Sequence, residues 1–399
     1  MKIGILFLVF GYFLSQFYRS FLAVLTPVLG PEIGTTAADL SFASGVWFIT
    51  FAAMQIPVGW ALDRFGPRVT ASLLLAVGGG GGAAAFALAQ GPWAVAVAMA
   101  LFGVGGAPIL MASYYIFART YPQAMFATLG GAMIGVGSAG NLAGSAPLAW
   151  AVETFGWRET MWGLAIVALL IAAALLTVLR DPPRDQTEAA ATGSLLSLFL
   201  DRNFLILFPM MLVIYAPAAG IRGLWAGPYL EDVFGMDATG IGNVTLIMAL
   251  AMAIGSFAYG PMERLINSKK KVILIGNTLV GALCLLLWIA PGQSWLLAAF
   301  AFTAIGFFGA SFPVLIAHGQ QFMPRHLTGR GMTLLNLFGI GGVGLLQFIT
   351  GAMAKSVSPE QAASPEFYSS IFLLFGVTTL IGCAIYSFAK ETRAIAQQV

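Results

Sequence analysis

The sequence predicts an all-α membrane protein of twelve transmembrane helices arranged as two bundles of six. The chain has 399 residues, of which 59% are hydrophobic and only 9% are charged. A soluble globular domain carries about 25% charged residues, so the composition excludes a soluble protein. Apolar runs of about 20 residues, the length that crosses a bilayer, recur along the whole chain. Features of the first half return about 200 residues later in the second half.

Each predicted crossing is a long apolar run, and the joints carry residues typical of turns, such as Gly30-Pro31 and Pro291-Gly292. The 48 glycines lie mostly within these runs, where small residues let helix backbones approach closely in lipid. The predicted spans are residues 4–30, 39–62, 69–89, 93–117, 125–150, 159–179, 203–230, 238–260, 272–290, 295–318, 329–354 and 367–389.

The distribution of Lys and Arg predicts the orientation, because basic residues concentrate in cytoplasmic loops. All basic residues but four fall on one side of the predicted bilayer. Arg158 and Lys355 fall on the other side, and Arg19 and Arg222 lie inside the first and seventh spans. Both termini are therefore expected in the cytoplasm. The expected location is the plasma membrane, which is the inner membrane in a bacterium.

The only polar connection of any length, RDPPRDQTEAAATGSLLSLFLDR, divides the chain into six spans plus six. We expect an N-terminal bundle at 1–180, a cytoplasmic linker at 181–202 and a C-terminal bundle at 203–399.

The two halves repeat. Arg19 and Arg222 each follow a tyrosine by seven residues, and an acidic residue followed by arginine ends the second span at Asp63 and the eighth at Glu263. Parallel repeats of six helices imply two bundles around a central cavity, with the binding site where the bundles meet.

Arg19 and Arg222 are the candidate binding groups. An arginine at membrane depth costs about 3 kcal/mol on insertion scales, and no acidic residue lies deep in a predicted span. The simplest explanation is that an anionic substrate supplies the missing negative charge, since guanidinium groups bind carboxylate or phosphate with two hydrogen bonds. The alternative is that each arginine extends to the membrane surface or pairs with helix carbonyls.

Further candidates surround the arginines. Tyr12 and Gln16 share a helical stripe with Arg19, and Tyr215 and Trp225 share one with Arg222. Trp225 fits a membrane-interface position equally well. The remaining substrate-binding candidates, for which core packing or interhelical hydrogen bonding is the alternative, are Tyr18, Tyr114, Tyr115, Asn141 and Asn336.

The sequence shows no pattern of an enzyme active site, a metal site or a cofactor site. GVGSAG at 135–140 matches a dinucleotide motif but lies within a predicted helix, and Lys269–Lys271 reads as positive-inside charge and not as a nucleic-acid site. His318 is the one titratable group near a span with a pKa in the physiological range. It is a candidate coupling residue, and a structural histidine is the alternative.

The loop after the second span, GWALDRFGPRV, resembles the Gly-x-x-x-Asp-Arg-x-Gly-x-Arg signature of the major facilitator superfamily of secondary transporters. The resemblance extends over nearly the whole chain and implies a conformational gate on the cytoplasmic side. In this gate Gly59 would permit close helix contact and Asp63 would hold the halves together in one state. The matching gate residues are Gly59, Asp63, Arg64, Gly66 and Arg68, with Glu263 and Arg264 as their counterparts in the second half.

Within the superfamily, QIPVGWALDRFGPRVT and the first span are similar to the organic-anion branches, which include anion:cation symporters and organophosphate:phosphate antiporters. This similarity implies that Arg19 and Arg222 hold the anionic group. Tyr18 replaces the acidic residue that sugar-acid symporters keep beside the arginine, and the arginine in the fourth span of many proton-coupled members is missing.

We therefore expect a monomer in the lipid bilayer that imports a small organic anion, preferentially a carboxylate, by alternating access with proton coupling. The alternatives are an exchanger of organic anions and phosphate, an exporter of drugs or metabolites, and a transporter-like anion sensor.

Overall fold

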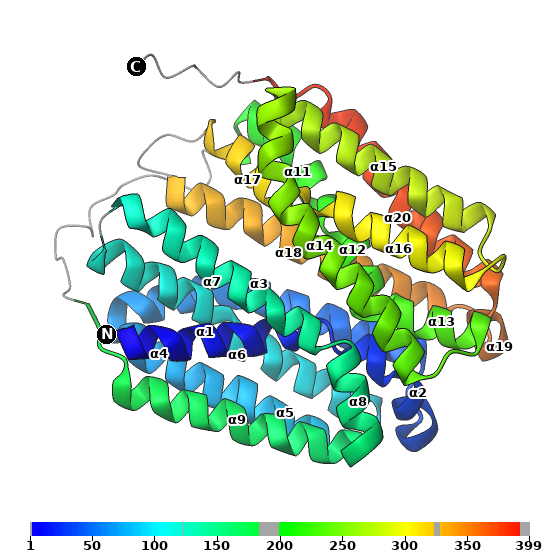
Figure 1. Ribbon diagram of the computed structural model, residues 1–399, viewed down its shortest axis with the longest axis horizontal. Coiled ribbons are helices and arrows are strands. Elements are labelled where there is room, and N and C mark those ends of the chain that lie inside the picture. Colours follow the sequence, from blue (N-terminus) through cyan, green and yellow to red (C-terminus); the bar gives the residue numbers. More distant parts are fainter. Residues whose placement is uncertain (1, 122, 183–198, 323–327, 392–399) are drawn as a thin grey trace.

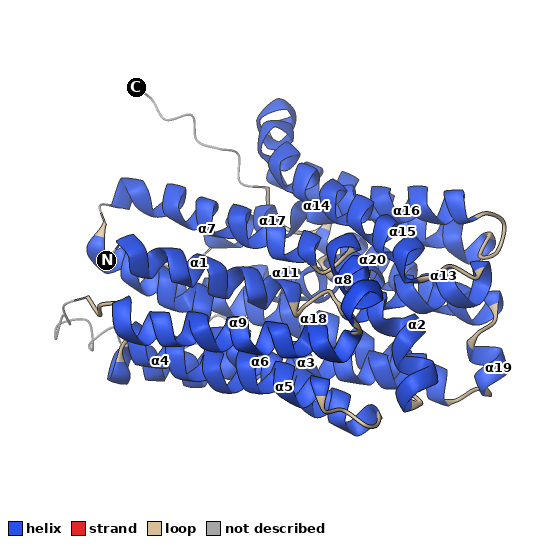
Figure 2. Cartoon of the chain, turned by 60° about the horizontal axis from the view of Figure 1, so that its bottom comes forward, coloured by secondary structure: helices blue, strands red, loops and turns tan. Residues whose placement is uncertain are grey.

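The computed structural model describes residues 2–121, 123–182, 199–322 and 328–391, and its regular elements in these ranges are all helices (Figure 2). The helices of the first half of the chain are α1 (Lys2–Phe17), α2 (Leu22–Ile33), α3 (Ala37–Phe65), α4 (Pro67–Leu74), η1 (Leu75–Gly80), α5 (Gly81–Ala87), α6 (Pro92–Thr120), α7 (Gln123–Ala143), α8 (Ala146–Phe155) and α9 (Trp157–Val178). Those of the second half are α11 (Arg202–Ile214), α12 (Ala216–Gly220), η3 (Ile221–Trp225), α13 (Ala226–Phe234), α14 (Ala238–Ile266), α15 (Lys269–Ile289), α16 (Trp295–Phe308), η4 (Gly309–Ser311), α17 (Phe312–Gln320), α18 (Thr328–Lys355), α19 (Pro359–Ala362) and α20 (Pro365–Tyr386).

These helices agree with the predicted crossings. Within the described residues, ten spans are long and apolar enough to cross a bilayer, and α1 and α2 form an eleventh that is bent by 55°. Helices α7 and α8 occupy the place of the remaining predicted span, residues 125–150. Most of the predicted linker, residues 183–198, lies outside the described residues, so the division into two bundles at 181–202 stays a prediction.

Four of the described spans contain an irregular turn: η1 interrupts the third span and η4 the tenth, and the other two irregular turns hold the candidate arginines. The bend between α1 and α2 spans residues 18–21, which include Arg19. In the seventh span, the π-helix η3 contains Arg222. Irregular turns in a transmembrane helix expose backbone and re-aim side chains, and they are common at functional sites. The two candidate arginines therefore both lie where their helices are interrupted.

Glycines bring neighbouring helices into backbone contact within each half. A Cβ atom built on Gly78 of η1 would lie 2.2 Å from the backbone nitrogen of Gly105 on α6, and one on Gly255 of α14 would lie 2.3 Å from the carbonyl oxygen of Phe307 on α16. Figure 1 shows the helices of the first half, blue to green, packed together below those of the second half. Small residues thus supply the close packing that helix association in lipid requires.

The halves touch each other through the ends of their helices that face away from the basic loops. A Cβ atom on Gly227 of α13 would lie 2.2 Å from the carbonyl oxygen of Ala23 on α2, and one on Gly242 of α14 would lie 3.0 Å from Ala149 of α8. Similarly, a Cβ atom on Gly45 of α3 would lie 2.9 Å from the Phe348 ring on α18. Because the basic loops mark the cytoplasmic side, these contacts close the outer side.

The cytoplasmic end of α3 behaves differently. Gly59 is exposed, and a Cβ atom added there would meet nothing within 4 Å. Gly59 therefore makes no close helix contact in this conformation, and its role in a cytoplasmic gate stays a prediction. Contact on the outer side and open space at Gly59 together describe an inward-facing state.

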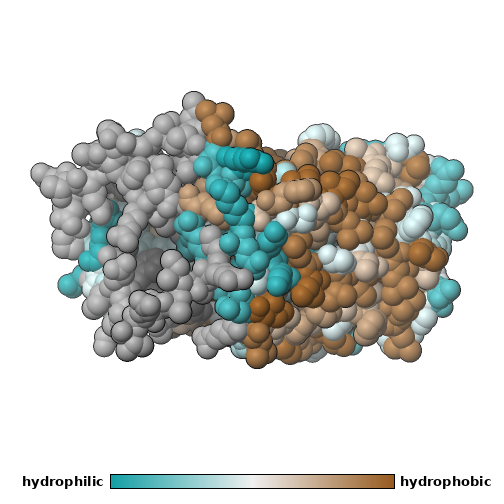
Figure 3. Space-filling model, turned by 90° about the horizontal axis from the view of Figure 1, so that it is seen from above, coloured by the Kyte–Doolittle hydropathy of each residue, from teal (hydrophilic) through white to brown (hydrophobic). Residues whose placement is uncertain are grey.

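The surface matches a lipid environment. Figure 3 shows an apolar band bounded by polar side chains near the middle of the view and at its right edge. Large apolar side chains point outward along the spans, including Trp93 and Phe257, each 76% exposed. A soluble protein would not present such a continuous apolar surface to water.

Candidate functional site

Arg19 lies in the break between α1 and α2 and has no hydrogen-bond partner among the described residues. Its guanidinium carbon lies 5.2 Å from the centre of the Trp47 ring and 5.7 Å from the centre of the Phe51 ring, both on α3. These are cation–π distances, so the rings stabilise the charge without occupying its hydrogen-bond donors. The hydrogen-bond donors of Arg19 are therefore unused within the described part of the chain.

Arg222 is 3% exposed and already has partners. One terminal nitrogen donates to the side-chain oxygen of Asn141 at 2.8 Å, and the other donates to the Asn141 backbone oxygen at 3.3 Å. Asn141 belongs to α7, so these hydrogen bonds join the two halves of the chain. The interhelical alternative for Asn141 thus describes this conformation, in which a neutral amide occupies the guanidinium fork.

The two arginines approach each other across the plane between the halves. A Cβ atom on Gly223, next to Arg222, would lie 3.2 Å from the Arg19 carbonyl oxygen, and the two guanidinium charges are close enough to interact. Tyr12 lies within electrostatic range of Arg19, and Tyr215 lies within electrostatic range of Arg222 and of Tyr12. Among the described residues, no acidic side chain forms an ion pair with either arginine. The site therefore has excess positive charge.

Tyr12 and Gln16 extend this site along α1. The Gln16 amide nitrogen donates to the Tyr12 hydroxyl at 3.2 Å, while the Gln16 side-chain oxygen is buried without a partner. Tyr114 on α6 is also in electrostatic range of Tyr12. The predicted stripe on the first span thus faces the region between the halves.

Trp225 is fully buried, which excludes the membrane-interface position. Its indole nitrogen donates to the side-chain oxygens of Gln347 and Thr350 on α18, each at 3.1 Å. The Ser41 hydroxyl on α3 donates to the Gln347 backbone oxygen at 2.6 Å. We call Ser41, Trp225, Gln347 and Thr350 the outer gate, because these side chains join the halves on the closed side.

Three further candidates lie elsewhere. Tyr18 is buried within the first half, where its ring stacks on Phe102 at 3.9 Å. The Tyr115 ring lies 3.8 Å from the guanidinium carbon of Arg119. Asn336 is half-buried on α18, and none of the described residues hydrogen-bonds to its amide. The structure does not bring these three together with the arginines.

His318 is buried at the cytoplasmic end of the tenth span, between α17 and the end of the chain's last described helix. Its Nδ1 atom lies 2.6 Å from the Tyr386 hydroxyl, and its Nε2 atom lies 3.1 Å from the Lys390 backbone oxygen. Since a backbone oxygen only accepts, Nε2 carries the proton and Nδ1 accepts from Tyr386. Both ring nitrogens are therefore used in holding α17 against α20.

We predict that His318→Phe lowers stability without changing coupling. The variant loses both hydrogen bonds and leaves the buried Tyr386 hydroxyl without its acceptor, at a cost of about 1–3 kcal/mol. A lower melting temperature in detergent, with an unchanged dependence of uptake on pH, is the expected result. A folded variant whose uptake no longer depends on pH would contradict this prediction and would support a role of His318 in proton coupling.

The signature loop after α3 is ordered by Asp181. The Arg68 backbone nitrogen donates to the Asp181 carboxylate at 2.8 Å, and Gly66 adopts a positive φ of 84°, where a Cβ atom would lie 2.7 Å from that carboxylate. Arg64 lies 5.5 Å from the Trp60 ring. The side chains of Asp63 and Arg264 lie outside the described residues, and Glu263 pairs with Lys269 of the same half.

Sequence reasoning missed the residues that contact the predicted ones. Trp47 and Phe51 around Arg19, and Ser41 and Thr350 in the outer gate, were not predicted. The available signal was weak, because an aromatic pair four residues apart and single hydroxyls are ordinary in an apolar helix. Only the folded arrangement shows what they touch.

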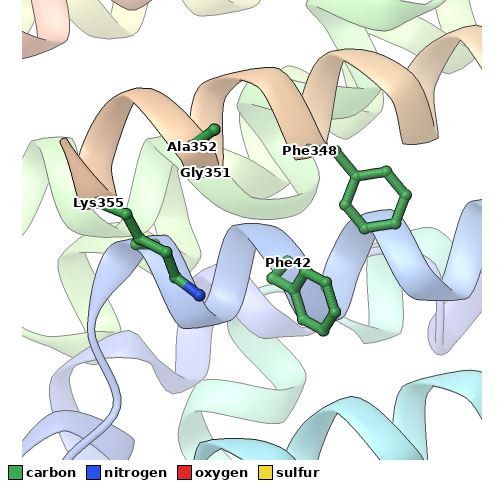
Figure 4. Close-up of a pocket in the computed structure, with 6 residues that line it drawn as sticks. Phe42, Phe348, Gly351, Ala352 and Lys355 are labelled. Atoms are coloured by element: carbon green, nitrogen blue, oxygen red, sulfur yellow. The ribbon is translucent and has the colours of Figure 1, made fainter.

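A pocket of ≈ 380 Å³ lies on the outer side between α3 and α18 (Figure 4). It is lined by Ala38, Phe42, Phe348, Gly351, Ala352 and Lys355. The lining is apolar apart from Lys355, which lies 3.9 Å from Asp39 across the two halves. Neither candidate arginine contributes to this pocket, so it is distinct from the anion site.

The fold is that of a membrane transporter, and comparison with known proteins agrees. The sequence model of the Major Facilitator Superfamily matches residues 8–223 and 207–398, and the chain belongs to this family. The apolar helices and the family place the chain in the plasma membrane as a multi-pass protein. The fold is that of transporters and not of enzymes.

Individual relatives are distant. The chain is 22% identical over 323 residues to the probable sulfoacetate transporter SauU of Cupriavidus necator, covering 73% of this chain and 71% of that protein. It is 25% identical over 340 residues to the membrane sensor protein UhpC of Escherichia coli, covering 75% and 73%. A bacterial homologue of the lysosomal transporter Spinster, in an inward-facing and occupied conformation, is similar with a TM-score of 0.77 at 17% identity, covering 96% and 95%.

Proposed function

We propose that this protein imports a small organic anion, preferentially a carboxylate, by alternating access as a monomer. The observation that carries the proposal is the pair of arginines that approach across the two halves without an acidic partner among the described residues. An anion between them would supply the missing charge and would draw the halves together, which couples binding to closure.

The substrate class follows from the donors. Arg19 offers its guanidinium nitrogens, and Arg222 offers a fork that the neutral Asn141 amide fills in the empty state. A carboxylate is a stronger acceptor than an amide and fits the guanidinium fork with two hydrogen bonds, so it would displace Asn141. The similarity to a probable sulfoacetate transporter supports an organic anion with more than one charged group.

Proton symport is the expected driving force by family resemblance, but one observation favours exchange. His318 uses both ring nitrogens in a structural contact, and no carboxylate among the described residues pairs with the arginines. A proton would then travel on the substrate itself. Exchange of one anion for another needs no titratable protein group, so it is the second candidate function.

Purified protein tests the proposal directly. Melting temperature is measured with sulfoacetate, glucuronate, benzoate and glycerol 3-phosphate, followed by flux into proteoliposomes with and without a pH gradient. Stabilisation by a carboxylate and uptake driven by an inward proton gradient would support symport, whereas uptake only into vesicles preloaded with anion would support exchange. Binding without flux would favour the sensor alternative, and stabilisation only by cations or neutral compounds would contradict the proposal.

A further inference from the structure

Trp47 on α3 is a buried donor without an acceptor. Its side chain is fully buried, and its indole nitrogen has no hydrogen-bond partner in the part of the chain that the structure describes. Buried polar groups in native proteins are almost always paired, so an unpaired one calls for a specific explanation.

The other two buried tryptophans show what this chain does with an indole when its role is structural. The Trp157 nitrogen donates to the Glu32 carboxylate at 2.7 Å, and the Trp225 nitrogen donates to Gln347 and Thr350. In both cases the acceptor lies on another helix, where Gln347 and Thr350 are buried and Glu32 is exposed. Trp47 is the exception among these three side chains.

Trp47 lies directly against the candidate arginine. The Arg19 guanidinium carbon is 5.2 Å from the centre of the Trp47 ring. The Phe51 ring stacks on the Trp47 ring, with 5.1 Å between the ring centres and an interplanar angle of 18°, and the two rings form an aromatic platform. The Arg19 Nε atom is buried without a partner as well. Two unpaired donors, one charged and one neutral, therefore lie side by side.

A single oxyanion would satisfy both donors. A carboxylate bound to the Arg19 guanidinium would lie beside the Trp47 side chain, because the guanidinium carbon is 5.2 Å from the centre of that ring. Its second oxygen could then accept a further hydrogen bond. The aromatic platform also fixes the plane of the guanidinium, which limits how the anion can approach.

We propose that Trp47 is a further substrate-binding residue, whose indole N–H donates to the anionic group that Arg19 holds and thereby selects an oxyanion with two or more free oxygens. The proposal rests on the proposed function, because it needs an anion at Arg19. It adds a neutral donor from a helix that carries neither arginine.

Trp47→Phe tests the N–H alone, since phenylalanine keeps an aromatic ring beside Arg19. Trp157→Phe is the matched control, because it removes an indole N–H that has a structural acceptor in the same half. Dissociation constants for sulfoacetate, glucuronate and benzoate, and the melting temperature without anion, are measured for the parent and both variants.

Trp47→Phe is expected to weaken binding about tenfold or more, the size of a lost hydrogen bond to a charged group, with the melting temperature of the empty protein unchanged. Trp157→Phe is expected to lower the melting temperature and leave the dissociation constant unchanged. Parent affinity in a folded Trp47→Phe variant would overturn the proposal, as would equal weakening by Trp157→Phe. If the parent protein binds none of the three anions, both the proposed function and the role of Trp47 fail. If Arg19→Gln abolishes anion binding while Trp47→Phe leaves the dissociation constant unchanged, only the role of Trp47 fails.

Discussion

Arg19→Gln and Arg222→Gln are each expected to lower anion uptake at least about 100-fold. Glutamine keeps a polar side chain of similar length but cannot offer a charged two-donor fork, and a lost charge-assisted hydrogen-bond pair costs about 3 kcal/mol or more. Uptake into proteoliposomes and the dissociation constant of the purified variants measure the loss.

The two variants should differ in stability, because the two arginines have different partners. Arg222→Gln removes both hydrogen bonds to Asn141 and should lower the melting temperature of the empty protein. Arg19→Gln removes a membrane-embedded cation that has no hydrogen-bond partner among the described residues, so the empty protein should be as stable or more stable.

Arg158→Gln is the matched control. Arg158 donates to the backbone oxygens of Ala87 and Ala89 near the outer surface and has no contact with the candidate site. Its replacement should leave the affinity for the anion unchanged. Transport of an anion at the parent rate by both Arg19→Gln and Arg222→Gln would show that the arginines do not hold the substrate.

The predicted crossings and the arginine pair were accessible from sequence because both are local signals. Apolar length sets a transmembrane helix, and a cation within such a run stands out against its neighbours. The bend at residues 18–21 and the π-helix that contains Arg222 were not accessible, since an interrupted helix keeps the same apolar composition.

Polar side chains with two possible roles needed the fold to decide between them. Trp225 has the composition of an interface residue, but its indole nitrogen is bound to Gln347 inside the protein. His318 lies near a span end, yet its ring is fixed by Tyr386 and Lys390. In both cases the deciding partner lies more than 60 residues away in the chain, where no pattern of spacing reveals it.

The open space at Gly59 has a related cause. In alternating access the two halves move apart on one side of the membrane as they meet on the other. A residue that contacts the other half in one conformation, as predicted for Gly59, therefore has open space around it in the opposite conformation. The structure therefore displays the outer contacts, which the sequence did not predict, and the predicted cytoplasmic gate stays a prediction.

The π-helix η3 connects the candidate site with those outer contacts. Arg222 and Trp225 are three residues apart in this short element, and Trp225 reaches Ser41 on α3 through Gln347 and Thr350. An anion that displaces Asn141 from Arg222 changes the contacts that hold the Arg222 side chain. We expect these changes to alter the hydrogen bonds of Trp225 in the outer gate, because η3 carries both side chains.

Gly227→Ala is expected to stop transport by preventing closure of the outer side. The added Cβ atom would lie 2.2 Å from the Ala23 backbone oxygen and 2.7 Å from the Thr26 hydroxyl oxygen. A backbone oxygen inside a helix cannot move aside as a flexible side chain can, so α13 and α2 would have to separate. The inward-facing state is then lost, while the outward-facing state, in which the halves are apart at this place, remains available. Uptake should fall at least about 100-fold with anion binding from the outside retained, because the binding groups are untouched.

A cysteine introduced at Ala38, which is buried beside α18 on the outer side, reports the conformation. Both natural cysteines are buried, so labelling by a membrane-impermeant thiol reagent measures the new site. In the Gly227→Ala background Ala38→Cys should react readily, and in the parent background it should react slowly. Gly163→Ala is the matched control, since a Cβ atom there meets nothing within 4 Å, and it should transport at the parent rate. Parent transport by Gly227→Ala would show that the approach of α13 to α2 is not required in the transport cycle, and the outer side would then have to close through the contacts of α3 with α18 and of α14 with α8.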